Sequence, residues 1–285
     1  MQVAPAIAKH CPFLMESDIL SLSPGFRLNC SNNTLEDTAL GVAHQLQPQA
    51  HALVIVLVRG LAVAELRNLA VVVSVKDLQL TELLGALNIT GGLLRSRAAR
   101  AWPKAPFIQL SHLLMGIMYS RLSWRRPGTP ANVFVGVARA SLPVSISAAL
   151  VGSFMVGSGT VSLGTGALAV GFGLAVFLLS IFLHELVHIL LARRGGAQTA
   201  VLQRGMRLGI LHRTLPPHIE IRSALAGPAV GLGTGLVAAS CVFALSPTLG
   251  LLGCSIGLFH LGGLLPWYGD GISLRRARQQ RRSGT

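Results

Sequence analysis

The chain has 285 residues, of which 51% are hydrophobic and 12% are charged, and its mean hydropathy is +0.60. Because charged residues make up about a quarter of typical soluble domains, this composition argues against a purely soluble protein. The formal net charge of +14 does not predict nucleic-acid binding, since the basic residues flank apolar runs instead of forming a stripe interleaved with aromatic side chains. The four cysteines form no CxxC pair, so no disulfide framework is expected.

Residues 1–100 are predicted to form a small cytoplasmic α/β domain. The first 25 residues lack a continuous apolar stretch and include charged side chains, so no cleavable signal peptide is expected. The expected elements of this domain are strands at Phe26–Cys30 and Val71–Val75, a helix over 34–47 and a helix from Asp77. The apolar run His51–Arg59 is too short to span a bilayer. No residue of this domain suggests catalysis.

Residues 101–130 form a basic junction. The segment Pro106–Tyr119 is apolar but short for a membrane crossing, and arginines follow it, so an interfacial helix is predicted. His112 is alone on this segment. Nothing beside it completes a ligand set, and packing is therefore a better interpretation than metal binding.

Residues 131–274 are predicted to form a membrane domain with four helical spans, followed by a basic tail over 275–285. The expected spans cover about 132–156, 163–192, 224–245 and 248–267. Residues 101–285 hold sixteen basic side chains and three acidic ones, and the arginines gather on one side of the expected spans. The positive-inside rule then predicts a multi-pass protein of the cell membrane with both termini in the cytoplasm.

The second expected span contains the pentapeptide His-Glu-Leu-Val-His at 184–188. Glu185 is the only charged side chain between residues 166 and 192, and a carboxylate in hydrocarbon indicates a functional site. Residues four apart lie on one face of a helix, so His184 and His188 can bind a single ion. Glu185 is close enough to take a proton from a metal-bound water. The pattern predicts a zinc hydrolase that works within the bilayer.

A catalytic zinc site needs a third protein ligand and an open position for water. Beyond residue 100 the only acids are Glu185, Glu220 and Asp270. Asp270 follows the last expected span, at the level of the pentapeptide, whereas Glu220 precedes the third span without such a setting. His212 and His218 are further possible ligands, but histidines in an arginine-rich loop are more often solvated.

The third expected span carries Gly227, Gly231 and Gly235 at intervals of four residues. This spacing predicts a smooth helix face on which another helix backbone can approach closely. The loop 197–222 before it has alternating residues near Ala200–Leu211, so we expect a strand edge there that could hold an extended peptide substrate.

These motifs together resemble the site-2 protease family of intramembrane zinc metalloproteases. The resemblance covers roughly residues 160–275 and rests on His184–His188, on Leu-Ala-Gly-Pro at 225–228 and on Leu-Leu-Pro followed by Asp-Gly at 264–271. It implies that His184, His188 and Asp270 bind one zinc ion, that Glu185 is the general base, and that a three-helix core carries the site. The implied substrate is a membrane-anchored protein or a small peptide precursor.

The chain departs from the family pattern in its last motif. The family usually has an asparagine at the start of this motif, where this chain has Gly262-Gly263, and one more residue between Pro266 and Asp270. The asparagine is thought to position the substrate or polarise the scissile carbonyl. His260 could replace it, although a hydrogen-bonded core histidine is the alternative interpretation.

Three function classes follow from these observations. The first is an intramembrane zinc endopeptidase in which zinc activates a water and Glu185 accepts its proton. The second is a membrane scaffold or regulator that keeps the fold but has lost efficient catalysis, as the missing asparagine suggests. The third is a transporter with the same ligands, which is disfavoured because the spans have few polar residues and no clear inverted repeat.

Overall fold

The computed structural model describes residues 14–97, except 15, 17 and 24, and residues 123–283, except 205 and 267. The chain forms two compact units. The first comprises residues 1–127 together with 200–208, and the second comprises residues 128–199 together with 209–285. The predicted interfacial helix over Pro106–Tyr119, with His112, lies outside the described residues.

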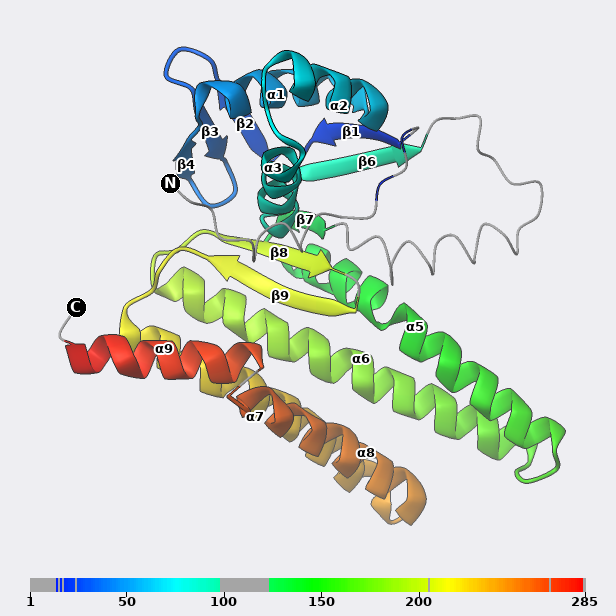
Figure 1. The fold of residues 1–285 in the computed structure, drawn as a ribbon. Helices are drawn as coiled ribbons and strands as arrows, with labels where there is room; N and C mark the ends of the chain where they lie inside the picture. The colour runs from blue at the N-terminus through cyan, green and yellow to red at the C-terminus, as the bar shows by residue number, and fades with distance from the viewer. Residues whose placement is uncertain are drawn as a thin grey trace. The chain divides into compact units, whose positions relative to one another are not determined.

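In its described part, the first unit combines small antiparallel sheets with short helices (Figure 1). One sheet has the strand order β5-β1-β6, and a second is the meander β2-β3-β4. The elements are β1 (Asp18–Leu22), β2 (Phe26–Asn29), β3 (Thr34–Asp37), β4 (Val42–Gln45), α1 (Pro48–Arg59), β5 (Leu61–Ala62), α2 (Val63–Val72), α3 (Asp77–Ile89), β6 (Leu93–Arg97) and β7 (Ser123–Pro127).

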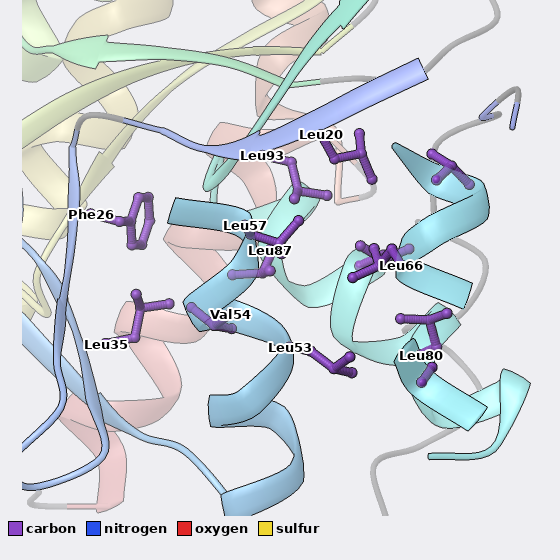
Figure 2. Close-up of a cluster of buried hydrophobic side chains, with 13 residues drawn as sticks. Leu20, Phe26, Leu35, Leu53, Val54, Leu57, Leu66, Leu80, Leu87 and Leu93 are labelled. Atoms are coloured by element: carbon purple, nitrogen blue, oxygen red, sulfur yellow. The ribbon is translucent and has the colours of Figure 1, made fainter. Parts of the chain in front are cut away.

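The core of this unit is a cluster of buried hydrophobic side chains from its helices and strands (Figure 2). Each helix contributes residues spaced three or four positions apart, which is the pattern of a helix with one apolar face. The helical members include Leu53 and Leu57 of α1 and Leu66 of α2, and Leu20 and Leu93 of the sheet are also fully buried. The predicted α/β character of the N-terminal region is thus confirmed.

Two local predictions in this unit are wrong. The segment 34–47 forms strands β3 and β4, not a helix. The carboxylate of Asp37, which suggested a first helical turn, instead accepts hydrogen bonds from the amides of Ala39 and Leu40 at 3.2 and 3.1 Å and shapes the turn after β3. The segment 71–75 is not a strand, because α2 continues through Val72. The predicted strand from Phe26 and helix from Asp77 are confirmed.

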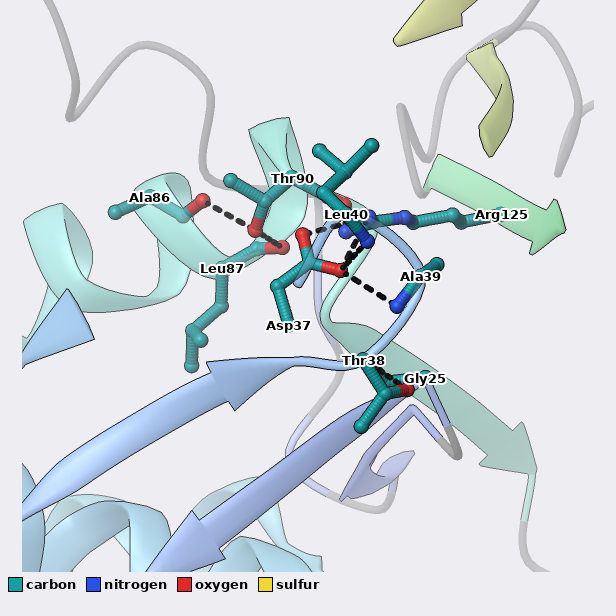
Figure 3. A network of polar contacts seen from close by, with 9 residues as sticks. All are labelled: Gly25, Asp37, Thr38, Ala39, Leu40, Ala86, Leu87, Thr90 and Arg125. Atoms are coloured by element: carbon teal, nitrogen blue, oxygen red, sulfur yellow. Dashed lines mark hydrogen bonds and ion pairs between the residues drawn. The ribbon is translucent and has the colours of Figure 1, made fainter. Parts of the chain in front are cut away.

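A buried ion pair ties β7 to the meander of the first unit (Figure 3). One Nη atom of Arg125 donates to both carboxylate oxygens of Asp37 at 2.6 Å, and the other donates to the carbonyl of Thr90 at 2.7 Å. Both charged side chains are only 2% exposed. The guanidinium also lies 4.9 Å from the ring centre of Phe26, a favourable cation–π distance. The pair therefore joins segments that are 88 residues apart.

The second unit is built from long helices (Figure 1). Its elements are α5 (Pro130–Gly157), α6 (Leu163–Arg194), α7 (Pro217–Phe243), α8 (Pro247–Phe259), the short 3-10 helix η3 (His260–Leu264) and α9 (Gly269–Ser283). Within this unit α7 packs against α6, α8 and α9, and α6 also packs against α5.

Four segments of this unit are long and apolar enough to cross a membrane, which confirms the predicted number of spans for the described residues. They are Pro130–Gly157, Leu163–Arg194, Pro217–Val242 and Pro247–Arg281. Two details differ from the prediction. The third helix begins at Pro217, seven residues earlier than expected, and the fourth is not continuous, because α8 ends at Phe259. These spans indicate a multi-pass membrane protein.

The predicted strands between the second and third spans are present as β8 (Thr199–Arg204) and β9 (Arg207–His212). They belong to a three-stranded sheet with the order β7-β8-β9. Residues 123–127 of β7 pair antiparallel with residues 200–204 of β8. Among the described strands, β9 is therefore at the edge of its sheet and has only one strand partner.

Candidate metal centre

Three polar side chains of α6 lie on one face of that helix. Ser180, His184 and His188 follow one another at intervals of four residues in a span that is otherwise almost entirely apolar. Because Cβ atoms four residues apart project from the same side of a helix, all three side chains point toward the helices packed on α6. The two histidines retain 12% exposure of their side chains.

Asp270 approaches the histidines from the first turn of α9. The chain leaves η3 in an extended conformation at Leu265, turns through a hydrogen bond from the amide of Tyr268 to the carbonyl of Leu265 at 2.9 Å, and enters α9. The N-terminal end of a helix favours a carboxylate, because its amide dipoles carry partial positive charge. The short connection after Pro266 thus delivers Asp270 to the site.

His184, His188 and Asp270 form a compact group of possible metal ligands. The Nε2 atoms of the two histidines are 3.2 Å apart. The Oδ2 atom of Asp270 lies 3.2 Å from Nε2 of His184, and its Oδ1 atom lies 3.3 Å from Nε2 of His188. Ligand atoms bound at about 2.0–2.1 Å to a tetrahedral zinc ion are about 3.3–3.4 Å apart. The donor types therefore fit zinc, and one ligand atom from each of the three residues lies within 4.8 Å of the other two.

The glycine face of α7 provides the space for this group. A Cβ atom at Gly227 would overlap the imidazole of His188 and lie 2.9 Å from Nε2 of His184. A Cβ atom at Gly231 would overlap the ring of His260. Only at Gly235 does the face meet another backbone, that of Gly257 in α8. The expected close helix approach is thus confirmed at one glycine, whereas the other two make room for imidazole rings.

Each histidine of the group has a hydrogen-bond partner for its second ring nitrogen. Nδ1 of His188 lies 2.9 Å from Oγ of Ser223 on α7. Nδ1 of His184 lies 3.3 Å from Nδ1 of His260, whose Nε2 atom is 2.9 Å from Oγ of Ser180. Such partners orient metal-binding histidines and fix which nitrogen carries the proton.

Sequence reasoning missed both serines. The signal for them was present, because Ser180 continues the four-residue spacing of the α6 histidines and Ser223 continues that of the α7 glycines. For His260, the interpretation as a hydrogen-bonded core histidine is confirmed. It lies where α8 ends at Phe259 and η3 begins. His260 is a buried, hydrogen-bonded histidine, and it points at a member of the candidate group.

Glu185 is half-buried beside the first histidine. Its carboxyl group interacts electrostatically with His184 and Asp270, so it lies within range of the candidate ligands without being one of them. A carboxylate in this neighbourhood can serve as a proton acceptor.

The other residues considered from the sequence are outside the group. Glu220 is buried on α7, and His218 is exposed in the first turn of that helix. His212 ends β9, where its Nδ1 atom lies 2.7 Å from the carbonyl oxygen of Arg213. Among the described residues, only His184, His188 and Asp270 form a group of at least three such side chains that could hold a metal ion. The described cysteines, Cys30, Cys241 and Cys254, are free.

Comparison of the chain with protein-family models, with curated proteins and with solved structures finds no match.

Proposed function

We propose that this protein is an intramembrane zinc metalloprotease that hydrolyses a peptide bond in a membrane-anchored protein or a small peptide precursor. One observation carries the proposal. One ligand atom from each of His184, His188 and Asp270 lies within 4.8 Å of the other two among candidate membrane spans, next to a carboxylate that is not part of the ligand group. The motif resemblance to site-2 proteases supports the same activity.

The proposed chemistry assigns a separate role to each group. Zinc supplies Lewis acidity, which lowers the pKa of water toward about 7 and polarises a carbonyl. His184, His188 and Asp270 would hold the ion. Glu185 accepts the proton of the attacking water and returns a proton to the amine that leaves when the peptide bond breaks. The residual exposure of the ligands, 12–17% of their side chains, allows a water to approach.

A transmembrane substrate must be locally unwound before it can be cut, because every peptide group of a helix is hydrogen-bonded within the helix. We propose that β9 holds the unwound segment by pairing with it along its outer edge. The strand ends at His212, and α7, which carries Ser223 and Gly227 beside the candidate ligands, begins five residues later at Pro217.

A photo-crosslinking amino acid at Gly209 of β9 tests this substrate path, because a Cβ atom there meets nothing within 4 Å. The same amino acid at Gly233 of α7, which is equally open, is the control. We expect a Glu185→Gln protein to capture a co-expressed substrate from Gly209 and not from Gly233. Capture from Gly233 alone would remove the support for strand addition.

The catalytic role of Glu185 is tested by co-expression with candidate membrane-anchored proteins and small peptides. Glu185→Gln keeps the side-chain shape and removes the proton acceptor, so product formation should fall by a factor of about 100 or more. Glu220→Gln makes the same change at a buried acid outside the ligand group and should retain most of the activity. Equal processing by wild type and Glu185→Gln would contradict a protease mechanism.

The metal itself is tested by elemental analysis of the purified protein. The wild type should contain about one zinc ion per chain, and a His184→Ala/His188→Ala protein should contain almost none. The matched control is His212→Ala/His218→Ala, which removes two histidines outside the group. Unchanged zinc content in the first variant would refute the ligand assignment.

A catalytically impaired membrane scaffold is the second candidate function, and one observation favours it. The chain has Gly262-Gly263 where related enzymes are expected to carry an asparagine, and glycine offers no side chain to a substrate carbonyl. Gly263 is close to the site, since a Cβ atom there would be 3.2 Å from Oδ2 of Asp270. A protein that binds zinc but shows no product dependent on Glu185 would support the scaffold.

A further inference from the structure

His260 and Ser180 form a chain of hydrogen bonds that ends at the proposed ligand His184. Oγ of Ser180 donates to the carbonyl oxygen of Phe177 at 2.9 Å. A serine hydroxyl has one hydrogen and a carbonyl oxygen only accepts. When the contact between Oγ and Nε2 of His260, also at 2.9 Å, is a hydrogen bond as well, Nε2 is its donor. The arrangement that satisfies both contacts therefore places a proton on Nε2 of His260.

This proton determines the state of the next ring. A neutral imidazole has one N–H group, so Nδ1 of His260 is an acceptor. It faces Nδ1 of His184 at 3.3 Å, and a hydrogen bond between the two nitrogens requires that His184 donates. The two ring centres are 5.2 Å apart, which is consistent with contact at the ring edges. His184 then has its free lone pair on Nε2, the atom that faces His188 and Asp270.

The packing around His260 holds its ring in this position. His260 is buried, with 6% of its surface exposed, and its ring fills the space that a side chain at position 231 would occupy. Ser180 lies one turn before His184 on the same helix, so α6 supplies both ends of the chain of hydrogen bonds. A rotated imidazole would lose its contact with Ser180 or with His184.

We infer that His260 is a positioning residue of the metal centre, which together with Ser180 holds His184 in the tautomer whose Nε2 atom is free to bind the ion. The inference rests on the proposed metal site and adds a residue that its ligand set does not include. In metal sites of this kind, removal of the partner of a histidine ligand weakens metal binding by roughly 10- to 100-fold.

Zinc affinity is the measurement that tests this role. The metal-free full-length protein in detergent is titrated with Zn²⁺ in competition with a chromophoric chelator. His260→Leu removes the acceptor, and zinc affinity should fall by roughly 10- to 100-fold. His260→Asn places an acceptor oxygen where the imidazole has Nδ1, so this variant should bind zinc nearly as tightly as the wild type. The visible absorption of the Co²⁺-loaded protein should change in His260→Leu and stay wild-type in His260→Asn.

A serine pair tests the outer part of the chain without altering an imidazole. Ser180→Ala removes the acceptor for His260 and should weaken zinc binding. Ser255→Ala on α8 removes a hydroxyl that bonds only to its own helix, at 2.9 Å from the carbonyl of Leu251, and should have no effect. If His260→Leu does not fold, this pair of serine variants still tests whether the chain of hydrogen bonds supports zinc binding.

The outcomes separate this inference from the proposal on which it rests. Wild-type protein that binds no zinc would refute the metal centre itself. Wild-type protein that binds zinc, with His260→Leu and His260→Asn equally weakened, would assign His260 to packing and overturn the inference. Zinc affinity equal to wild type in both His260→Leu and Ser180→Ala would overturn it as well.

Discussion

The imidazole of His188 occupies the position in which a Cβ atom of residue 227 would stand. Gly227 is therefore required by a side chain of the proposed metal centre, and not by the approach of another helix. Any larger residue at this position must displace a proposed ligand or move α7 away from α6.

Gly227→Ala should accordingly lower zinc content by roughly tenfold or more, because the added methyl group moves the ring out of ligand geometry. Gly233→Ala is the matched control, since it makes the same change on the same helix at a position where the methyl group meets nothing within 4 Å. Zinc per chain is measured by elemental analysis after purification. Equal zinc content in the two variants would contradict the role assigned to Gly227.

A second glycine pair tests the turn that carries Asp270. A Cβ atom at Gly271 would overlap the carbonyl oxygen of Leu265, whereas one at Gly269 meets nothing within 4 Å. Zinc that binds only the native state should raise the melting temperature of the wild type. We expect Gly271→Ala to lose this zinc-dependent rise and Gly269→Ala to keep it. A rise of wild-type size in Gly271→Ala would show that Asp270 does not depend on this turn.

Loss of the ion pair between Asp37 and Arg125 should destabilise the structure around β3 and α3. Asp37→Asn leaves a buried guanidinium without its counter-ion, which typically costs about 3–5 kcal/mol. Glu16→Gln disrupts a pair with Arg67 whose side chains are 74% and 56% exposed, and should cost less than about 1 kcal/mol. Hydrogen exchange of the β3 and α3 amides in the full chain measures both changes. Similar exchange rates in the two variants would contradict the stabilising role of the buried pair.

The proposed orientation of the spans can be read from single cysteines in a protein whose native cysteines are replaced by serine. A cysteine at Ser158, between the first two spans, should react with an impermeant maleimide on intact cells. A cysteine at Gln198, in the arginine-rich segment after the second span, should react only after permeabilisation. The reverse pattern would place the termini outside the cytoplasm.

The spans could be predicted because each has a local sequence signal. The candidate ligand group could be predicted because the chain offers few alternative ligands. An apolar run of about twenty residues identifies a candidate span by itself, and a four-residue spacing places two histidines on one helix face. The third member could be named because the last 185 residues contain only three acids. The predicted group and the observed one are the same three residues.

The errors occurred where distant contacts determine the local structure. The acidic pair at 36–37 resembles the first turn of a helix, but Asp37 pairs with Arg125, far along the chain. The valines at 71–73 favour a strand by propensity, yet α2 buries Val63, Leu66 and Ala70, and Val71 and Val72 lie on its exposed side. The fourth span was predicted as a continuous helix over 248–267, which the structure interrupts at Phe259.

The position of Asp270 at the start of α9 has a consequence for synthesis of the protein in the cell. Asp270 follows His188 by 82 residues, and two further spans lie between them. While the ribosome is still making those spans, the growing chain holds both histidines and Glu185 but lacks the third ligand. An enzyme with this arrangement cannot cut its membrane neighbours, or its own unfinished chain, until Asp270 has been made.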